Sequence, residues 1–141
     1  MRGFLIGLFL FSGLHALAAT EPDTIANWQL YFKQLQLKAF NTNDKDLRVR
    51  FTQTQMKYID TLTIRYWDDT PCFECNGNLT LTTLKDETLQ TIDRANSNFR
   101  YDLSMDELRA LALKNKVAVI RFYFREQAKG TTLLLFELEF P

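Results

Sequence analysis

Whether this sequence predicts a fold with helices or one made of strands depends first on residues Ile25–Phe40, IANWQLYFKQLQLKAF. This stretch follows Asp23-Thr24, a pair that favours the start of a helix, and the cluster Asn41–Asp44 after it favours an end. Its apolar side chains recur at helical spacing, at Ile25, Trp28, Phe32, Leu35 and Ala39, with Tyr31 alongside. We therefore expect an amphipathic helix over about residues 25–40. Its polar face, rich in Gln and poor in Lys and Arg, favours packing on a sheet over lying on a membrane.

Later segments of the chain predict strands. Leu47–Phe51 and Met56–Trp67 each contain a run in which apolar and polar residues alternate, which is typical of antiparallel strands with one buried face. Val117–Glu126 and Thr131–Phe140 are also rich in strand-forming residues, and the short connection between them contains Gly130. These two segments therefore predict a C-terminal hairpin.

Two further helices are expected between the strands. After a short strand at Leu79–Thr82, Thr83 with Asp86 three residues on resembles a capping box. The apolar stripe that follows consists of Leu84, Leu89, Ile92 and Ala95. A second start signal lies at Ser104. The predicted fold class is therefore α+β, with an antiparallel sheet of about four to five strands packed against two to three helices.

The N-terminus has the three parts of a secretory signal peptide. Arg2 is followed by an apolar run from Phe4 to Leu14 and by the small-residue stretch Ala16–Ala19. A run of this length is too short to span a bilayer as a helix. We expect residues 1–19 to be removed and residues 20–141 to form a single domain without a stable membrane span, in the periplasm or secreted.

Removal of the signal peptide would also remove His15, the only histidine. Without it the mature chain lacks the usual base of Ser-His and Cys-His hydrolases and the commonest zinc ligand. The whole chain carries 17 basic and 17 acidic residues, and the signal peptide accounts for just one of them, Arg2. A chain so near neutrality has no field that would recruit nucleic acid.

The only two cysteines, Cys72 and Cys75, lie in the stretch TPCFECNGNLTL, residues 70–81. A thioredoxin-type centre needs this spacing at the start of a helix, whereas Asn76-Gly77 and a strand follow here, and Glu74 opposes thiolate formation. Zinc would need about two more ligands, and haem attachment needs a His directly after Cys75. We expect a structural disulfide that shapes a turn, with redox catalysis as the competing interpretation.

Two other motifs carry weaker signals. Asp68-Asp69 is a pair of neighbouring carboxylates at a strand end, where adjacent residues point to opposite faces, so a solvated turn is expected. Asn78-Leu79-Thr80 matches the N-glycosylation pattern, which matters only in a eukaryotic host. Neither motif predicts a catalytic, cofactor or metal site.

The last strand is the predicted binding element. It has apolar residues on both faces, and at a sheet edge it would offer unpaired backbone groups to a second strand. The residues expected to contact a partner or a second copy of the chain are Leu134, Phe136, Leu138 and Phe140. The alternative is that helices of the same domain cover both faces.

Three segments resemble the C-terminal domains of the TonB and TolA envelope proteins. They are LRVRFTQTQMKYIDTLTIRYW at 47–67, LKDETLQTIDRANSNF at 84–99 and VAVIRFYF at 117–124. The resemblance covers roughly Ile25–Phe124 and implies an α+β fold, a periplasmic location and partner recruitment through sheet edges.

The sequence therefore predicts a non-enzymatic cell-envelope protein that acts by binding another envelope or secreted protein, with a homodimer through the C-terminal strand as a further possibility. No cofactor and no metal are expected. The alternatives are an inhibitor or immunity-type protein against a toxin or wall hydrolase, a thiol-disulfide protein that uses Cys72 and Cys75, and a carrier of lipid or another small ligand.

Overall fold

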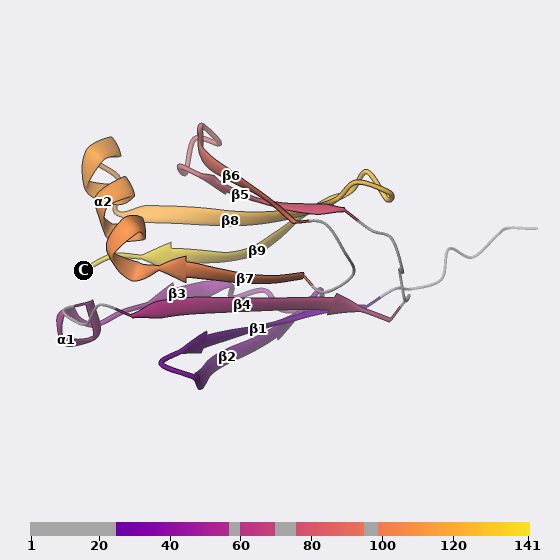
Figure 1. The fold of residues 1–141 in the computed structure, drawn as a ribbon, viewed down its shortest axis with the longest axis horizontal. Coiled ribbons are helices and arrows are strands. Elements are labelled where there is room, and N and C mark those ends of the chain that lie inside the picture. The colour runs from indigo at the N-terminus through magenta and orange to yellow at the C-terminus, as the bar shows by residue number, and fades with distance from the viewer. Residues whose placement is uncertain (1–24, 57–59, 70–75, 95–98) are drawn as a thin grey trace, which may run out of the picture.

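The structure, a computed structural model, describes residues 25–56, 60–69, 76–94 and 99–141. These residues form nine strands and two short helices (Figure 1). The strands are β1 Ala26–Phe32, β2 Leu35–Asn41, β3 Arg48–Arg50, β4 Thr61–Asp68, β5 Gly77–Thr82, β6 Thr88–Arg94, β7 Phe99–Ser104, β8 Val119–Glu126 and β9 Thr132–Glu139. The helices are α1 Gln53–Met56 and α2 Met105–Asn115.

The strands form two sheets. A four-stranded sheet has the order β2-β1-β4-β7 and is antiparallel throughout. A five-stranded sheet has the order β3-β9-β8-β5-β6 and is antiparallel except where β3 runs parallel to β9. Strands β1, β4 and β7 follow one another as strands A, B and E do in an immunoglobulin-like sandwich, and β5, β8 and β9 follow one another as C, F and G do. The architecture is therefore a two-sheet β-sandwich in which six strands have this order and β2, β3 and β6 are additional.

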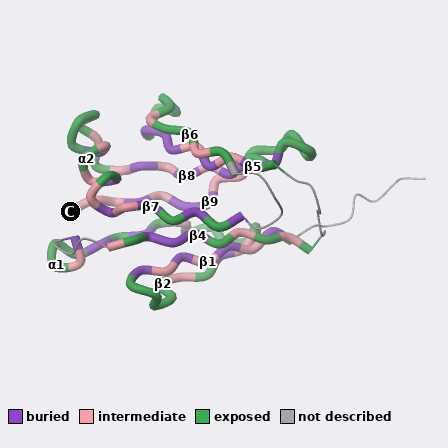
Figure 2. Tube along the Cα trace, viewed as in Figure 1, coloured by how far each residue is buried: buried purple, intermediate pink, exposed green. Residues whose placement is uncertain are grey.

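The core lies between the two sheets. Along β1, alternate residues are buried, and Figure 2 shows buried and exposed positions alternating along β7. Tyr66 on β4 and Phe99 on β7 meet Phe124 on β8, with ring centroids 4.0 and 4.8 Å from that of Phe124. This aromatic cluster joins the sheets, and it explains Gly77, where an added Cβ would lie 2.7 Å from Phe99 and 2.8 Å from Phe124. Gly77 is therefore the first residue of β5, where the two aromatic rings leave no room for a side chain, and it does not belong to a turn.

The predicted α+β fold class is wrong, because two of the expected helices are strands. Residues 25–40 form the β1–β2 hairpin, in which Ala26, Trp28, Leu30 and Phe32 face the core. The turn between the strands is Lys33-Gln34, and both residues take positive φ, 52° and 64°. A two-residue turn of this kind normally carries Asn or Gly, which is why the sequence does not signal a hairpin here.

The expected helix after Thr83 is also a hairpin, between β5 and β6. Thr83 does act as a capping residue, because its hydroxyl accepts hydrogen bonds from the backbone N–H groups of Lys85 and Glu87. The chain then turns back at Asp86, whose φ is 61°. A Thr hydroxyl that bonds the backbone this way stabilises a turn as readily as a helix start.

Other expectations are confirmed. The helix predicted at Ser104 is α2, and the Ser104 hydroxyl accepts a hydrogen bond from the N–H of Glu107. The C-terminal hairpin is β8–β9, and strands are present at Arg48–Arg50 and Thr61–Asp68. The expected antiparallel pairing holds for β4 but not for β3, which runs parallel to β9. Because the structure is a two-sheet sandwich, the α+β architecture implied by the TonB and TolA resemblance does not hold for this chain.

The signal peptide expected at 1–19 and the disulfide expected between Cys72 and Cys75 lie outside the described residues. Within the described part of the chain, no helix is both long enough and apolar enough to cross a membrane.

Candidate binding face

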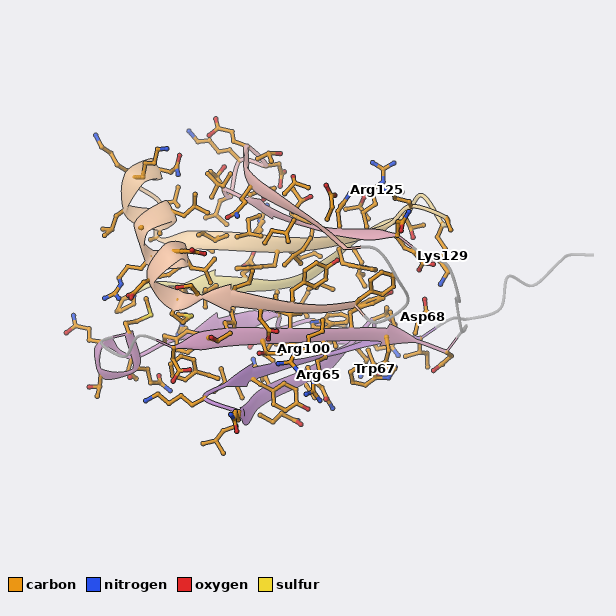
Figure 3. All side chains as sticks on the ribbon, viewed as in Figure 1. Arg65, Trp67, Asp68, Arg100, Arg125 and Lys129 are labelled. Atoms are coloured by element: carbon orange, nitrogen blue, oxygen red, sulfur yellow. The ribbon has the colours of Figure 1, made fainter. Side chains whose placement is uncertain are left out.

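The outer side of the four-stranded sheet carries six side chains that form what we call the polar face: Tyr31, Thr63, Arg65, Trp67, Arg100 and Asp102. They lie on the three strands β1, β4 and β7, and the strand register places Thr63 between Tyr31 and Asp102, and Arg65 beside Arg100. Figure 3 shows Arg65, Trp67 and Arg100 along β4 and β7. Four of the six, including both arginines and Trp67, are exposed. None of the helices and strands that the structure describes lies over this face.

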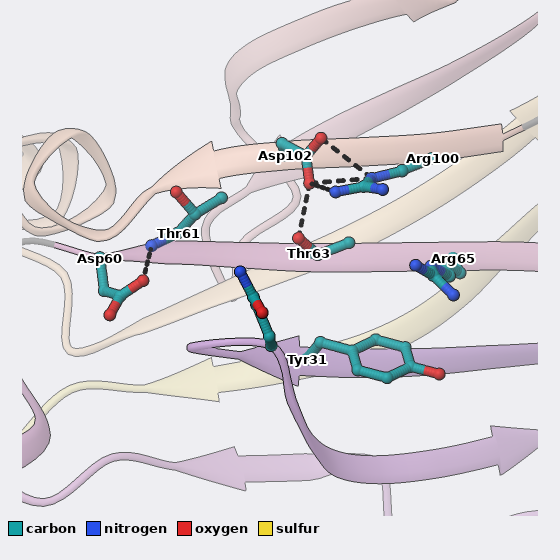
Figure 4. Close-up of a pocket in the computed structure, with 8 residues that line it drawn as sticks. Tyr31, Asp60, Thr61, Thr63, Arg65, Arg100 and Asp102 are labelled. Atoms are coloured by element: carbon teal, nitrogen blue, oxygen red, sulfur yellow. Dashed lines mark hydrogen bonds and ion pairs between the residues drawn. The ribbon is translucent and has the colours of Figure 1, made fainter.

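Arg100 is neutralised within the polar face. Its guanidinium donates to both carboxylate oxygens of Asp102, at 3.0 to 3.2 Å. The Thr63 hydroxyl donates to the same carboxylate at 2.5 Å (Figure 4). Asp102 is thus held by two neighbouring side chains, and its carboxylate forms an ion pair with Arg100.

Arg65 is in a different position. Its guanidinium carbon lies 4.8 Å from the centre of the Tyr31 ring, and the Tyr31 hydroxyl donates a hydrogen bond of 2.5 Å to Gln29. Directly opposite in the sheet is Arg100, a like charge. Among the described residues, Arg65 forms no ion pair. The Tyr31 ring therefore holds a cation in place by a cation–π contact and leaves its N–H groups to the solvent.

A shallow hollow of about 630 Å³ opens on this side of the sheet. Its lining includes Arg65 and Tyr31 on one side and Asp60 and Thr61 at the other end, where the Asp60 carboxylate accepts a hydrogen bond from the Thr61 N–H (Figure 4). The hollow is open to solvent and its walls are polar and charged. Its shape suits a surface side chain of a partner better than an enclosed small molecule.

The outer side of the five-stranded sheet differs, because cross-strand carboxylates neutralise most of its arginines. Glu137 accepts from Arg121 at 2.9 Å and lies 4.0 Å from Arg48. Arg50 is paired with Glu139 on the neighbouring strand. The hydrogen bond to Glu137 is the main reason that the pKa of Arg121 is raised.

A third ionic group bridges the two sheets at the end of the sandwich opposite α2. Lys129, in the turn between β8 and β9, contacts the carboxylates of Asp68 on β4 and Glu126 on β8, the latter at 3.2 Å (Figure 3). Burial lowers the pKa of Lys129, but its hydrogen bonds to the two carboxylates outweigh burial and raise it. Burial also raises the pKa of the neighbouring Tyr66 far above its usual range, with the charges of Asp68 and Glu126 adding to the effect. This cluster ties the two sheets together, so we assign it to stability.

The predicted site residues are distributed as follows. Asp68 and Asp69 do not share a site, because the side chain of Asp68 is buried and paired with Lys129, whereas Asp69 is exposed. Asn78 lies on β5, half-buried. The expected partner-binding strand is β9, which lies between β3 and β8 in the sheet order and so is not an edge strand. Of its four predicted contact residues, Phe136 and Leu138 are fully buried, and Leu134 and Phe140 are half-buried.

The polar face was missed at the level of sequence, although part of its signal is present there. The alternation in Thr61–Asp68 that places Leu62, Ile64 and Tyr66 on the core also places Arg65 and Trp67 on the opposite side. Tyr31 and Arg100 carry no such signal, because their approach to Arg65 depends on strand pairing.

No family model matches this chain, and no curated protein matches it either. Within the described residues, no group of three or more His, Cys, Asp or Glu side chains is placed to hold a metal ion.

Proposed function

We propose that this protein is a non-enzymatic binding domain that acts in the periplasm or outside the cell by contacting another protein through the polar face. The location rests on the signal peptide expected at residues 1–19. Since a sandwich of this architecture serves many unrelated functions, the proposal rests on the site and not on the fold.

The observation that carries the proposal is the grouping of Tyr31, Arg65 and Trp67 on one uncovered sheet surface. Trp, Tyr and Arg are the residue types that dominate the energetics of protein interfaces. Trp67 is 42% exposed, although burial of an indole ring normally contributes to stability. A large aromatic side chain left in water beside an arginine held on a tyrosine ring is the pattern expected for an interface before its partner binds.

Site-specific photo-crosslinking in cells that produce the protein tests this proposal. A photoreactive phenylalanine derivative at Asn27, which lies next to Trp67 in the sheet register, reports on the polar face. The same group at Thr91, on the outer side of the five-stranded sheet, is the matched control. We expect a protein adduct from position 27 that is absent from position 91.

The adduct should also weaken with Trp67→Ala, since truncation of an interface tryptophan commonly costs at least about 2 kcal/mol of binding, or more than tenfold in affinity. Adducts of equal yield from positions 27 and 91, or an adduct from position 27 that Trp67→Ala leaves unchanged, would contradict the proposal.

A further inference from the structure

The chemistry of the partner can be inferred from how the polar face is charged. Arg65 and Arg100 are directly opposite each other in the register of neighbouring antiparallel strands. Like charges in this position are unfavourable for a sheet. The face contains Asp102 as a counter-charge, but both of its oxygens are bonded to Arg100 and one also accepts from Thr63. One positive charge of the pair is therefore left without a carboxylate among the described residues.

The rest of the molecule shows that this arrangement is not a general property of its sheets. On the five-stranded sheet, the arginines of β3 face glutamates on β9 in register, and Arg121 shares Glu137 with Arg48. Arg125 faces Thr132, and for Arg48, Arg50 and Arg121 the cross-strand partner is a carboxylate. At Arg65 it is a second arginine.

The environment of Arg65 also prepares it for a planar acceptor. The Tyr31 ring covers one side of the guanidinium, and the hydroxyl of Tyr31 is anchored on Gln29. Stacking of this kind limits the rotamers of the side chain, so less conformational entropy is lost when its N–H groups bind a ligand. A guanidinium with a free edge matches the two oxygens of a carboxylate in a bidentate arrangement.

On the basis of the proposed function, we infer that the partner inserts an Asp or Glu side chain against Arg65, and that Trp67 packs on the apolar residues beside it. The ligand class is thus an acidic, partly apolar segment of a protein. Arg65 supplies the charge-assisted contact and Trp67 the apolar contact, whereas Arg100 and Asp102 form the preformed border of the site.

Selection from a random 12-residue peptide library displayed on phage tests this inference with a defined probe. The wild-type domain and Trp67→Ala are used in parallel, so that peptides lost with Trp67→Ala are assigned to the polar face. We expect these peptides to share an Asp or Glu. Conversion of that residue to Asn or Gln in a synthetic peptide should weaken binding about 10- to 100-fold, the usual value of a hydrogen-bonded charge.

The same conversion measured on variants assigns the contact. On Arg65→Gln it should change affinity less than about threefold, because the acid has lost its partner. On Arg125→Gln, which removes an exposed arginine from the other sheet, the loss should be as large as on wild type. Arg65→Lys keeps the charge without the planar fork and should give an intermediate loss. Unfolding in urea verifies that each variant is folded.

The outcomes separate the two proposals. The inference is overturned if the peptides that depend on Trp67 share no acidic residue. It is also overturned if neutralising that residue weakens binding to Arg65→Gln as much as binding to Arg125→Gln. In both cases the polar face remains the binding surface. Peptides that bind equally to Trp67→Ala, together with no adduct from position 27, overturn both. A library that yields no binders to the wild-type domain also counts against both.

Discussion

The outer sides of the two sheets use the same residue types in opposite ways. On the five-stranded sheet, Glu137 lies between two arginines and Glu139 pairs with a third, so three of the outer arginines are neutralised within the chain. On the four-stranded sheet, Arg65 faces Arg100 and contacts a tyrosine ring. The ion pairs of the five-stranded sheet add stability, whereas the guanidinium of Arg65 on the four-stranded sheet is available to bind a partner. The partner of each arginine, and not the number of arginines, therefore distinguishes a stabilising surface from a candidate binding surface.

The largest expected effect tests whether both surfaces rest on one core. Phe124 is 2% exposed and joins the sheets through Tyr66 and Phe99. Phe124→Ala should lower the free energy of unfolding by about 3–5 kcal/mol, because it leaves a cavity between the sheets. Urea unfolding followed by tryptophan fluorescence reports on the four-stranded sheet, which contains Trp28 and Trp67, and circular dichroism reports on all strands.

The two signals should change together in both wild type and variant, as expected for a single cooperative unit. If the fluorescence transition of Phe124→Ala separated from that of circular dichroism, the two sheets would be independent. The comparison of their surfaces would then have no common reference.

A smaller effect tests the comparison directly, through one charge removed from each surface. Glu137→Gln should destabilise the protein by about 1 kcal/mol, because Arg48 and Arg121 lose their shared carboxylate. Arg65→Gln should change the free energy of unfolding by less than about 0.5 kcal/mol or stabilise the protein slightly, since it removes a like-charge opposition. The measurement is urea unfolding at neutral pH at low and at high salt.

The difference between the two variants should shrink at high salt, because salt screens both effects. A loss for Arg65→Gln as large as that for Glu137→Gln would mean that Arg65 is a structural residue. The assignment of the polar face to binding would then be wrong.

The smallest expected effect is seen only at high pH and sets the interior apart from both surfaces. The raised pKa of Tyr66 means that the unfolded chain releases this proton first, from about pH 10 upward. The resulting contribution to stability is fully present below pH of about 10 and is lost as pH rises above it. Lys129, whose pKa is also raised, acts in the same direction.

Tyr66→Phe should therefore flatten the alkaline fall in stability without abolishing it. Tyr123→Phe is the matched variant on the outer side of the five-stranded sheet. There burial and the charge of Asp86 raise the tyrosine pKa as well, but the ring lies closer to solvent. It should flatten the fall less. The measurement is urea unfolding between neutral pH and about pH 11, and an equal effect of the two variants would contradict the assignment of Tyr66 to the interior.

Local signals in the sequence were sufficient wherever a pattern of residues was compatible with only one type of secondary structure. Ser104 with acidic residues in the following turn specifies the start of α2, and the β-rich segments around Gly130 specify the β8–β9 hairpin. The alternation in β4 likewise separates a core side from a solvent side. These features depend on neighbours within a few residues, which is the range over which capping and side-chain alternation act.

Where a pattern was compatible with both a helix and a strand, contacts in the tertiary structure selected between them. Trp28 and Phe32 are four residues apart, so they share a face in a helix and also in a strand. The segment forms a strand because β1 pairs with β2 on one side and with β4 on the other. The hydrogen bonds of these two pairings outweigh the local preference for a helix. The same is true of the polar face. The alternation along β4 was enough to place Arg65 and Trp67 on one side of a strand. Tyr31 and Arg100 come close to Arg65 through the register of β1, β4 and β7, because strand pairing joins residues that are far apart in the chain.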